Sequence, residues 1–357
     1  IQTTMSIMED LRRRGKEEHI KEPAQCRQIL AESIRSQMDL GENAYEFENH
    51  RSVVLVIGVN GDEESLARRG KANIKEQIRI LRQAAGQGAQ VLVIECMALQ
   101  PELQFAAQHR ILRADIGVIT NVRRDHTDVM GNTLTEICRS LSSTVPQNGV
   151  LFTGEETRRE QLAHAAQKLG SSFIPVYPPG AEPPFDFAEN IALALSVCEY
   201  LGVSRDIALS GMAQYKRDPY ALTIHKLYRA VWVNGLSIND VQSTCIVWEK
   251  LKERHNWAGR RLILLVNNRA DRGSRTKDML QVCMALAPSE VWLLGASQGY
   301  MALELKRHSI PARRFSGASV LDLTAPDENC VVFAVGNIAG EGRALMARIR
   351  KEGAPFV

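Results

Sequence analysis

A chain of 357 residues with 45% hydrophobic and 24% charged residues has room for two or three globular domains and a large core. Its 44 basic and 41 acidic residues leave a net charge of only +3, which argues against a nucleic-acid partner. Seven cysteines without a C-x-x-C pair argue against a disulfide framework and a zinc site, and favour a reducing compartment.

The first 48 residues are predicted to form a short, polar, helical segment. Apolar residues recur at helical spacing at Cys26, Ile29 and Ile34, and the basic run 12–14 fits a solvated helix face. The segment is too short to be a nucleotide-sugar-binding domain. Because the chain begins at Ile1 rather than at a methionine, we expect the N-terminus to be truncated.

A buried strand is predicted next, from Ser52 into the turn Asn60–Gly61. In a nucleotide-binding fold the first phosphate loop begins at such a turn. Here Asp62 and two glutamates follow at once, and their charges would repel a triphosphate. We therefore expect that a loop and a helix are missing after Gly61, before a predicted helix from about Asn73 to Ala85.

Two apolar runs, Val91–Ile94 and Ile116–Thr120, are predicted to be neighbouring, buried, parallel strands. Neither run alternates with polar residues, and a helix-sized segment, Pro101–Leu112, separates them. Ligands collect at the carboxyl ends of strands in an open parallel sheet. The polar residues at these two strand ends are Glu95, Asn121, Asp125, His126 and Asp128.

A carboxylate and an imidazole on neighbouring strand ends can bind a hard divalent cation together with phosphate oxygens and waters. The pattern therefore predicts a metal site at Glu95 and His126. Taken singly, the glutamate fits a helix cap and the Asp–His pair fits an ordinary turn equally well.

The rest of the chain alternates between predicted helices and strands. A buried helix containing Asn190 follows a proline-rich link, and a composition change near 216–219 marks a boundary to a doubly wound α/β domain. Before the boundary, helices are predicted at 134–144 and 158–169 and strands at 149–153 and 172–177. After it, strands are predicted at 230–234, 262–266, 290–294, 313–315 and 330–335, and helices near 242–254, 276–287, 297–307, 318–323 and 341–352.

Three predicted strand ends of the C-terminal domain carry polar groups, in the segments 237–240, 267–272 and 336–340. Guanidinium groups match carboxylates bidentately, so Arg269 and Arg272 suit a carboxylate-rich substrate. Alternatively, Asp271 pairs with Arg272, and the glycines of the last segment only make a tight turn.

Together these motifs resemble those of one enzyme family. N-x-x-x-D-H-x-D at 121–128 resembles the central-domain signature of the Mur ligase superfamily. E-C-M-A at 95–98, N-V-x-x-D-H-x-D-x-M-G at 121–131, N-x-R-A-D-R at 267–272 and G-N-I-x-G at 336–340 resemble the ligase subunit of poly-γ-glutamate synthase (PgsB/CapB type). The resemblance implies a Mur-ligase-like α/β fold. Its parts are a helical N-terminal segment (1–48), a central P-loop-type, parallel-sheet ATP-binding domain (49–215) and a C-terminal Rossmann-like ligase domain (216–357).

The resemblance also implies roles for individual residues. Glu95 and His126 would bind magnesium beside the γ-phosphate of ATP, while Asp125 and Asp128 orient His126 or waters. The implied catalytic residues are Glu95, Asn121, Asp125, His126 and Asp128. The implied ATP-binding residues are Asn60, Gly61, Asn190 and Asp240. The implied substrate-binding residues are Asn268, Arg269, Asp271, Arg272, Gly336 and Asn337.

The implied activity is ATP-dependent amide ligation with Mg²⁺ and an acyl-phosphate intermediate, which lengthens a capsular poly-γ-glutamate chain. The implied partners are glutamate, the growing chain and the membrane subunits of the synthase, at the cytoplasmic face of the membrane; a homo-oligomer stays open. Two alternatives also stay open. A folylpolyglutamate or cell-wall ligase shares the mechanism but not the R-A-D-R and G-N-I motifs, and a non-enzymatic scaffold fits the incomplete phosphate loop.

Overall fold

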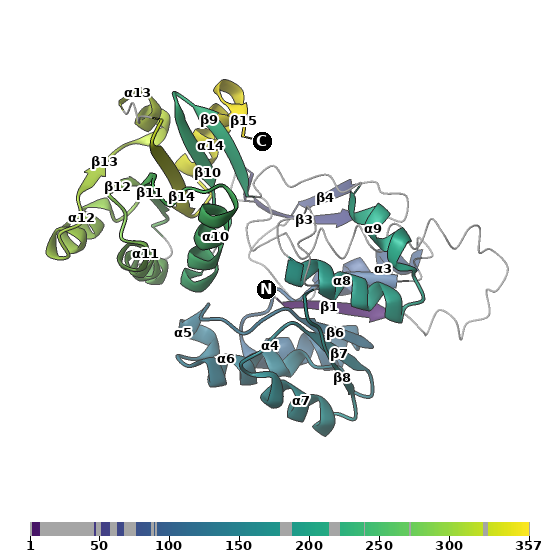
Figure 1. Cartoon of the computed structure of the whole chain (residues 1–357). Coiled ribbons are helices and arrows are strands. Elements are labelled where there is room, and N and C mark those ends of the chain that lie inside the picture. The colour runs from purple at the N-terminus through teal and green to yellow at the C-terminus, as the bar shows by residue number, and fades with distance from the viewer. Residues whose placement is uncertain are drawn as a thin grey trace. The chain divides into compact units, whose positions relative to one another are not determined.

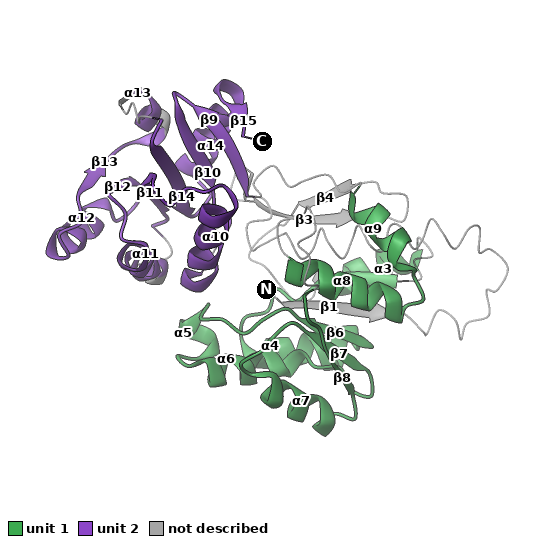
Figure 2. Ribbon diagram, viewed as in Figure 1, with its two compact units in different colours: residues 1–217 green, residues 218–357 purple. Residues whose placement is uncertain are grey.

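The computed structural model describes residues 2–7, 46–47, 51–57, 63–67, 76–86, 89, 91–178, 188–213, 222–238, 240–270, 273–323 and 328–356. The chain divides into two compact units, Ile1–Arg217 and Asp218–Val357 (Figure 2). A separate N-terminal domain at 1–48 stays a prediction. Within the described ranges, no helix has both the length and the apolar character needed to span a bilayer.

The first unit is built on a five-stranded sheet (Figure 1). Strands β6, β7 and β8 are parallel, and β1 runs antiparallel between β5 and β6. As a result β5 and β6 point the same way, and their carboxyl ends lie at one edge. In sheet order the strands are β5 (Val91–Glu95), β1 (Gln2–Ile7), β6 (Ile116–Ile119), β7 (Val150–Thr153) and β8 (Ser172–Pro175).

Helices cover both faces of this sheet, which explains why β6 and β7 are buried at every position. On one face, Val118 and Phe152 pack against α8 (Ala188–Tyr200) and α9 (Arg205–Ala213). On the other, Ile119 and Leu151 pack against α6 (Leu134–Leu141) and α7 (Arg159–Lys168). The remaining helices of the unit are α3 (Glu76–Gly86), α4 (Pro101–Ala106) with its π-helical continuation η1 (Ala107–Leu112), α5 (Thr127–Met130) and the 3₁₀ turn η2 (Ser142–Thr144).

Two expectations for the N-terminal part are wrong. Residues 2–7 form β1 and not a helix, in keeping with their β-branched Thr3, Thr4 and Ile7. Because β1 lies between β5 and β6, these two strands are not neighbours and lie about 10 Å apart, twice the usual strand spacing. The helices expected within 8–45 lie outside the described residues.

The predicted phosphate-loop strand is present, but it belongs to a different sheet. β3 (Arg51–Ile57) pairs antiparallel with β2 (Glu46–Phe47) and β4 (Glu63–Ala67) in a separate three-stranded sheet. The short connection 58–62 allows antiparallel pairing, whereas a parallel neighbour requires a crossover of a dozen residues or more.

The second unit contains a seven-stranded sheet with five parallel strands, and all five strands predicted there are confirmed. Two antiparallel strands at one side of the sheet, β9 and the edge strand β15, were missed. In sheet order the strands are β13 (Ala312–Arg314), β12 (Glu290–Gly295), β11 (Arg261–Asn268), β14 (Cys330–Gly336), β10 (Ala230–Asn234), β9 (Thr223–Leu227) and β15 (Ala354–Pro355).

The helices predicted for this unit are also confirmed, with shifts at their ends. They are α10 (Val241–Arg254), α11 (Gly273–Leu286), α12 (Gln298–Arg307), the 3₁₀ turn η3 (Gly317–Ser319) with α13 (Val320–Leu323), and α14 (Glu341–Glu352). The core between them contains the tryptophans Trp232 and Trp292. All four tryptophans of the chain lie in this unit, so their fluorescence reports on it alone.

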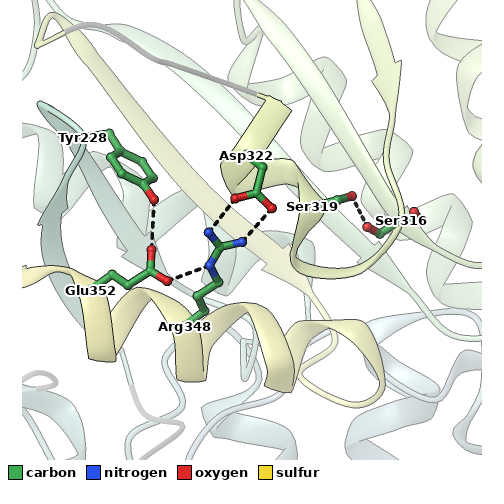
Figure 3. A network of polar contacts seen from close by, with 6 residues as sticks. All are labelled: Tyr228, Ser316, Ser319, Asp322, Arg348 and Glu352. Carbon is green, nitrogen blue, oxygen red and sulfur yellow. Dashed lines mark hydrogen bonds and ion pairs between the residues drawn. The ribbon is translucent and has the colours of Figure 1, made fainter.

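A polar network joins α14, α13 and the turn before β10, on the side of the second sheet where its parallel strands begin (Figure 3). Arg348 of α14 donates two hydrogen bonds to Asp322 of α13 (2.8 and 2.5 Å) and one to Glu352 (2.7 Å), and Tyr228 Oη donates to Glu352 (2.9 Å). Tyr228 lies in the turn before β10, and α13 precedes β14, so the network lies away from the carboxyl strand ends. Nearby, Ser319 Oγ donates to the carbonyl oxygen of Ser316.

Arg348→Gln is expected to lower the urea midpoint of the tryptophan fluorescence transition. The Arg348 hydrogen bonds lower the pKa of the carboxyls of Asp322 and Glu352. A lowered folded-state pKa means that this stabilisation is present near neutral pH and is lost as pH falls through the lowered values. The difference in urea midpoint between the variant and the wild type should therefore become smaller in acid and in high salt. Arg307→Gln, which removes a single exposed pair with Glu304, is the control; an equal effect of both variants would contradict the network's role.

Candidate functional site

The first candidate site lies at the carboxyl edge of the sheet in unit 1. Glu95 is the last residue of β5 and is half-buried. Its neighbour Cys96 is buried, and burial raises the pKa of the Cys96 thiol to about 11. That thiol is therefore protonated at neutral pH and is not a nucleophile. At this strand end, Glu95 and not Cys96 is therefore the candidate for binding a ligand.

His126 has the left-handed backbone conformation, with φ 47° and ψ 44°. Its N–H donates to Asp125 Oδ1 (2.8 Å), and its Nε2 lies 3.7 Å from Asp125 Oδ2. The carbonyl of His126 accepts from Val129 and Met130 and so begins α5. Positive φ in a non-glycine residue costs about 1–3 kcal/mol and is found at active sites as well as in ordinary turns. The imidazole is 12% exposed, so it is enclosed but reachable.

The other predicted residues of this loop lie on either side of His126. Asn121 is half-buried directly after the buried Thr120, and Asp128 is exposed in the first turn of α5. The loop closes at Gly131, whose φ is 118° and where an added Cβ would lie 2.4 Å from Glu136 Cβ. A side chain would clash there, so the turn between α5 and α6 requires glycine at position 131.

Sequence reasoning missed Glu155, a buried carboxylate that follows β7. Its Oε2 accepts a hydrogen bond from Val122 N (2.6 Å), one residue after Asn121. A glutamate in T-G-E-E looks like a surface residue in the sequence. Its partner Val122 lies 33 positions away, so no local pattern could have revealed the contact.

The residues predicted at this edge would suit a magnesium ion better than a closed zinc site. Among the residues that the structure describes, no three His, Cys, Asp or Glu side chains are grouped to hold a metal. Magnesium usually takes one or two carboxylates and completes its octahedron with waters and phosphates, whereas structural zinc takes four protein ligands. One carboxylate and one imidazole on strands that end at the same edge fit the first description.

A second candidate site lies at the carboxyl ends of β10, β11 and β14 in unit 2, where four asparagines are buried. The Asn267 amide nitrogen donates to the carbonyl oxygens of Asn337 (2.5 Å) and Ala339 (3.0 Å), and Asn337 N donates to Asn267 O (2.9 Å). Asn337 Oδ1 accepts from Ala339 N (2.8 Å). The cluster comprises Asn234, Asn267, Asn268 and Asn337.

The backbone around this asparagine cluster is packed so closely that side chains are excluded. Gly336 has φ 106°, and an added Cβ would meet Asn267 O at 2.4 Å; at Gly342 it would meet the Asn267 amide nitrogen at 2.7 Å. Glu341 accepts from Gly295 N (3.0 Å) and so joins α14 to the end of β12. Gly336 of G-N-I-A-G thus does more than make a turn, because it lets the β11 and β14 ends touch, whereas an added Cβ at Gly340 would meet nothing within 4 Å.

The structure brings together Asn268, Gly336 and Asn337 of the predicted substrate residues, with Arg269 half-buried directly after β11. The predicted nucleotide residue Asp240 is the N-cap of α10, and both its carboxylate oxygens accept from Ser243. Asn190 lies half-buried in the first turn of α8. Asn60, Gly61, Asp271 and Arg272 lie outside the described residues.

Comparison with solved structures gives the fold class. The chain resembles the bifunctional folylpolyglutamate synthase/dihydrofolate synthase from Yersinia pestis, complexed with AMPPNP and Mn ion, with a TM-score of 0.58 and 15% identity over 92% of this chain and 87% of that one. It also resembles MurF from Acinetobacter baumannii (TM-score 0.53, 13% identity, 92% and 75% coverage). The fold is that of the Mur ligases.

Comparison with known sequences gives the family. The family described as poly-gamma-glutamate synthase CapB C-terminal domain matches residues 220–352. The capsule biosynthesis protein CapB of Bacillus anthracis is 31% identical over 321 residues, 84% of this chain and 69% of that protein. The PGA synthase CapB of Bacillus subtilis (strain 168) is 32% identical over 301 residues, with 78% and 76% coverage. The chain belongs to the CapB family of poly-γ-glutamate synthases.

Proposed function

We propose that this chain is an ATP-dependent amide ligase that joins glutamate through γ-carboxyl linkages, with ATP and Mg²⁺ as cofactors. The observation that carries the proposal is the strand-end pair of Glu95 and the strained His126, in a chain of the CapB family. A carboxylate does not react with an amine at neutral pH until its oxygen becomes a leaving group. Phosphorylation by ATP supplies that leaving group, and the amine of the incoming glutamate then displaces phosphate.

In this proposal the residues of unit 1 hold the metal and the phosphates. A bound Mg²⁺ neutralises charge on the transferring phosphoryl group. Glu95 supplies a carboxylate oxygen and His126 an imidazole nitrogen, while Asp125 fixes the His126 backbone through the hydrogen bond from its N–H. These groups bind and orient, which is the main protein contribution to phosphoryl transfer.

The residues of unit 2 are assigned to the carboxylate-bearing substrate. Arg269 is a fixed positive charge directly after β11, beside the buried asparagine cluster. The first turn of α14 has no side-chain cap but carries Glu341, so the positive charge in this assignment comes from Arg269. This combination favours a glutamate carboxylate over a neutral acceptor.

The direct test is ATP consumption by the full chain in Mg²⁺ with glutamate or poly-γ-glutamate as acceptor. Glutamate-dependent ADP release, with a γ-linked product in the mass spectrum, supports the proposal. Turnover only with a folate or a UDP-linked acceptor would assign the chain to the related ligases. Absence of ATP binding would favour the scaffold, which the incomplete phosphate loop keeps as the second candidate.

Arg269→Gln is expected to raise KM for glutamate about 10–100-fold, since a hydrogen bond to a charged group contributes roughly 1.5–3 kcal/mol. KM for ATP should change far less. Arg272→Gln, made alongside it, should follow the same pattern. Arg254→Gln removes an exposed charge at the end of α10 and is the control. A change confined to the ATP constant would place these arginines on the nucleotide instead.

We further propose that the ligase works at the cytoplasmic face of the membrane, bound through membrane subunits of the synthase. A capsule polymer has to cross that membrane, so its synthesis beside an exporter avoids a free cytoplasmic pool. Fractionation of cells with and without the membrane subunits tests this placement. A chain that stays soluble in both cases would contradict it, and sedimentation of the purified chain tests for a homo-oligomer.

A further inference from the structure

Side chains continue the connection between β6 and β7 beyond the point where their backbone pairing stops. The last paired residues are Ile119 and Thr153. Thr153 is fully buried; its hydroxyl donates to Ile119 O (2.6 Å) and accepts from Glu155 N (3.0 Å). An added Cβ at Gly154 would lie 3.0 Å from Thr120 O, so the two chains stay close past the end of the strands.

Glu155 is the last link in this connection and has two arms. On one arm, Oε2 accepts from Val122 N in the loop after β6 (2.6 Å). On the other, Oε1 accepts from Thr157 N (2.8 Å), Thr157 Oγ1 (2.6 Å) and Arg158 N (2.9 Å) at the start of α7. The residue is 5% exposed, and these four hydrogen bonds all come from donors. Such a carboxylate is held by charge-assisted hydrogen bonds.

The Val122 arm bears directly on the loop of the first candidate site. Val122 is 3% exposed and lies between Asn121 and the strained His126. A buried N–H without an acceptor costs about 1–3 kcal/mol, so this contact restrains where the loop leaves β6. We infer that Glu155 is a positioning residue for the metal site, and that its carboxylate holds the 121–126 loop in the metal-binding geometry. This inference rests on the proposed function of Glu95 and His126.

The competing explanation is that Glu155 only caps α7 and stabilises the fold. The two arms can be separated chemically. In Glu155→Gln a single amide oxygen remains, and it is better satisfied by the three donors of Thr157 and Arg158 than by Val122 alone. The amide nitrogen then faces Val122 N, donor against donor, so the loop arm is lost while the cap persists. Thr157→Val does the reverse, because it removes a hydroxyl from the cap and leaves the Val122 contact intact.

The experiment measures Mn²⁺ binding to the full chain by electron paramagnetic resonance with AMPPNP present, together with the Mg²⁺ dependence of ATP consumption. Direct hydrogen-bond partners of metal ligands typically contribute 10–100-fold to affinity, and Glu155 acts one step further away, through the Val122 backbone, so we expect about 10-fold. Glu155→Gln should weaken Mn²⁺ binding by about that factor. It should raise the half-maximal Mg²⁺ concentration in parallel and leave kcat at saturating Mg²⁺ nearly unchanged. Thr157→Val and the exposed neighbour Glu156→Gln should bind Mn²⁺ like wild type.

Wild-type Mn²⁺ affinity in both Glu155→Gln and Glu155→Ala would overturn the inference, as would an equal weakening in Thr157→Val. Circular dichroism verifies that each variant is folded. If Glu155→Ala does not fold, the decision rests on Glu155→Gln, which preserves size and shape. A wild-type chain that binds no Mn²⁺ would instead count against the proposed function, so the two failures are distinguishable.

Discussion

Glu95→Gln and His126→Ala are each expected to reduce magnesium-dependent ATP consumption by about 10³-fold or more. A divalent ion stabilises the charge of phosphoryl transfer by several kcal/mol, and each 1.36 kcal/mol of barrier is a factor of about ten. The proposed site has one carboxylate and one imidazole from the protein, so the loss of either removes half of its protein ligands. Glu95→Gln keeps the side chain's size and removes its charge, which separates binding from packing.

The measurement is ATP turnover over a range of Mg²⁺ concentrations, with circular dichroism as the check on folding. Exposed residues of the same unit supply the controls: Glu102→Gln on α4 and His164→Ala on α7 remove the same chemical groups from solvent positions. Wild-type turnover in either test variant at limiting Mg²⁺ would remove that residue from the metal site.

The parts of the fold that follow from local pattern could be predicted from the sequence. In unit 2 the strand 230–234 was predicted with its observed bounds, and 330–335 differs from β14 by one residue, since both are apolar runs buried at every position. The start of α6 is equally local, because Thr133 and Glu136 form a reciprocal cap in T-L-T-E.

The parts that depend on distant contacts could not be predicted. β9 and β10 are joined by Tyr228 and Arg229, with φ 51° and 79°, a two-residue turn that usually contains Asn-Gly or Asp-Gly. Without that signal the sequence shows no hairpin. The position of β1 between β5 and β6 is likewise a pairing across more than 80 residues, which no periodicity encodes.

The residues of the candidate sites fall into the same two groups, those that local pattern predicts and those that depend on distant contacts. Strand-end polarity pointed to His126 and Asn337. Asn267 was noted as the first residue of N-x-R-A-D-R but was given no role, and Glu155 was missed, because each acts through partners 33 to 72 residues away. Both are buried groups that hold a loop and touch no solvent. Their importance lies in what they position, so composition and spacing alone give no sign of it.

Asn267→Asp is expected to destabilise unit 2 by about 3–5 kcal/mol at neutral pH. The Asn267 side chain is 1% exposed, and its nitrogen donates to two carbonyl oxygens. An ionised carboxylate in its place would set a buried negative charge against those two carbonyl oxygens. The loop 337–340 would lose its side-chain hydrogen bonds to β11 and keep only the backbone bond from Asn337 N to Asn267 O, so KM for glutamate should rise as well.

The effect of Asn267→Asp should depend on pH in a defined direction. Burial beside carbonyl oxygens favours the protonated acid, which can still donate one hydrogen bond, so the folded state raises the pKa of the new carboxyl. The variant therefore keeps most of its stability below the ordinary carboxyl pKa of about 4 and loses it as pH rises through the raised value. Urea unfolding followed by tryptophan fluorescence at several pH values measures this in unit 2 alone. Asn256→Asp, at an exposed position of the same unit, should unfold like wild type throughout. If Asn267→Asp matches that control near pH 8, the Asn267 amide does not hold the β14 loop.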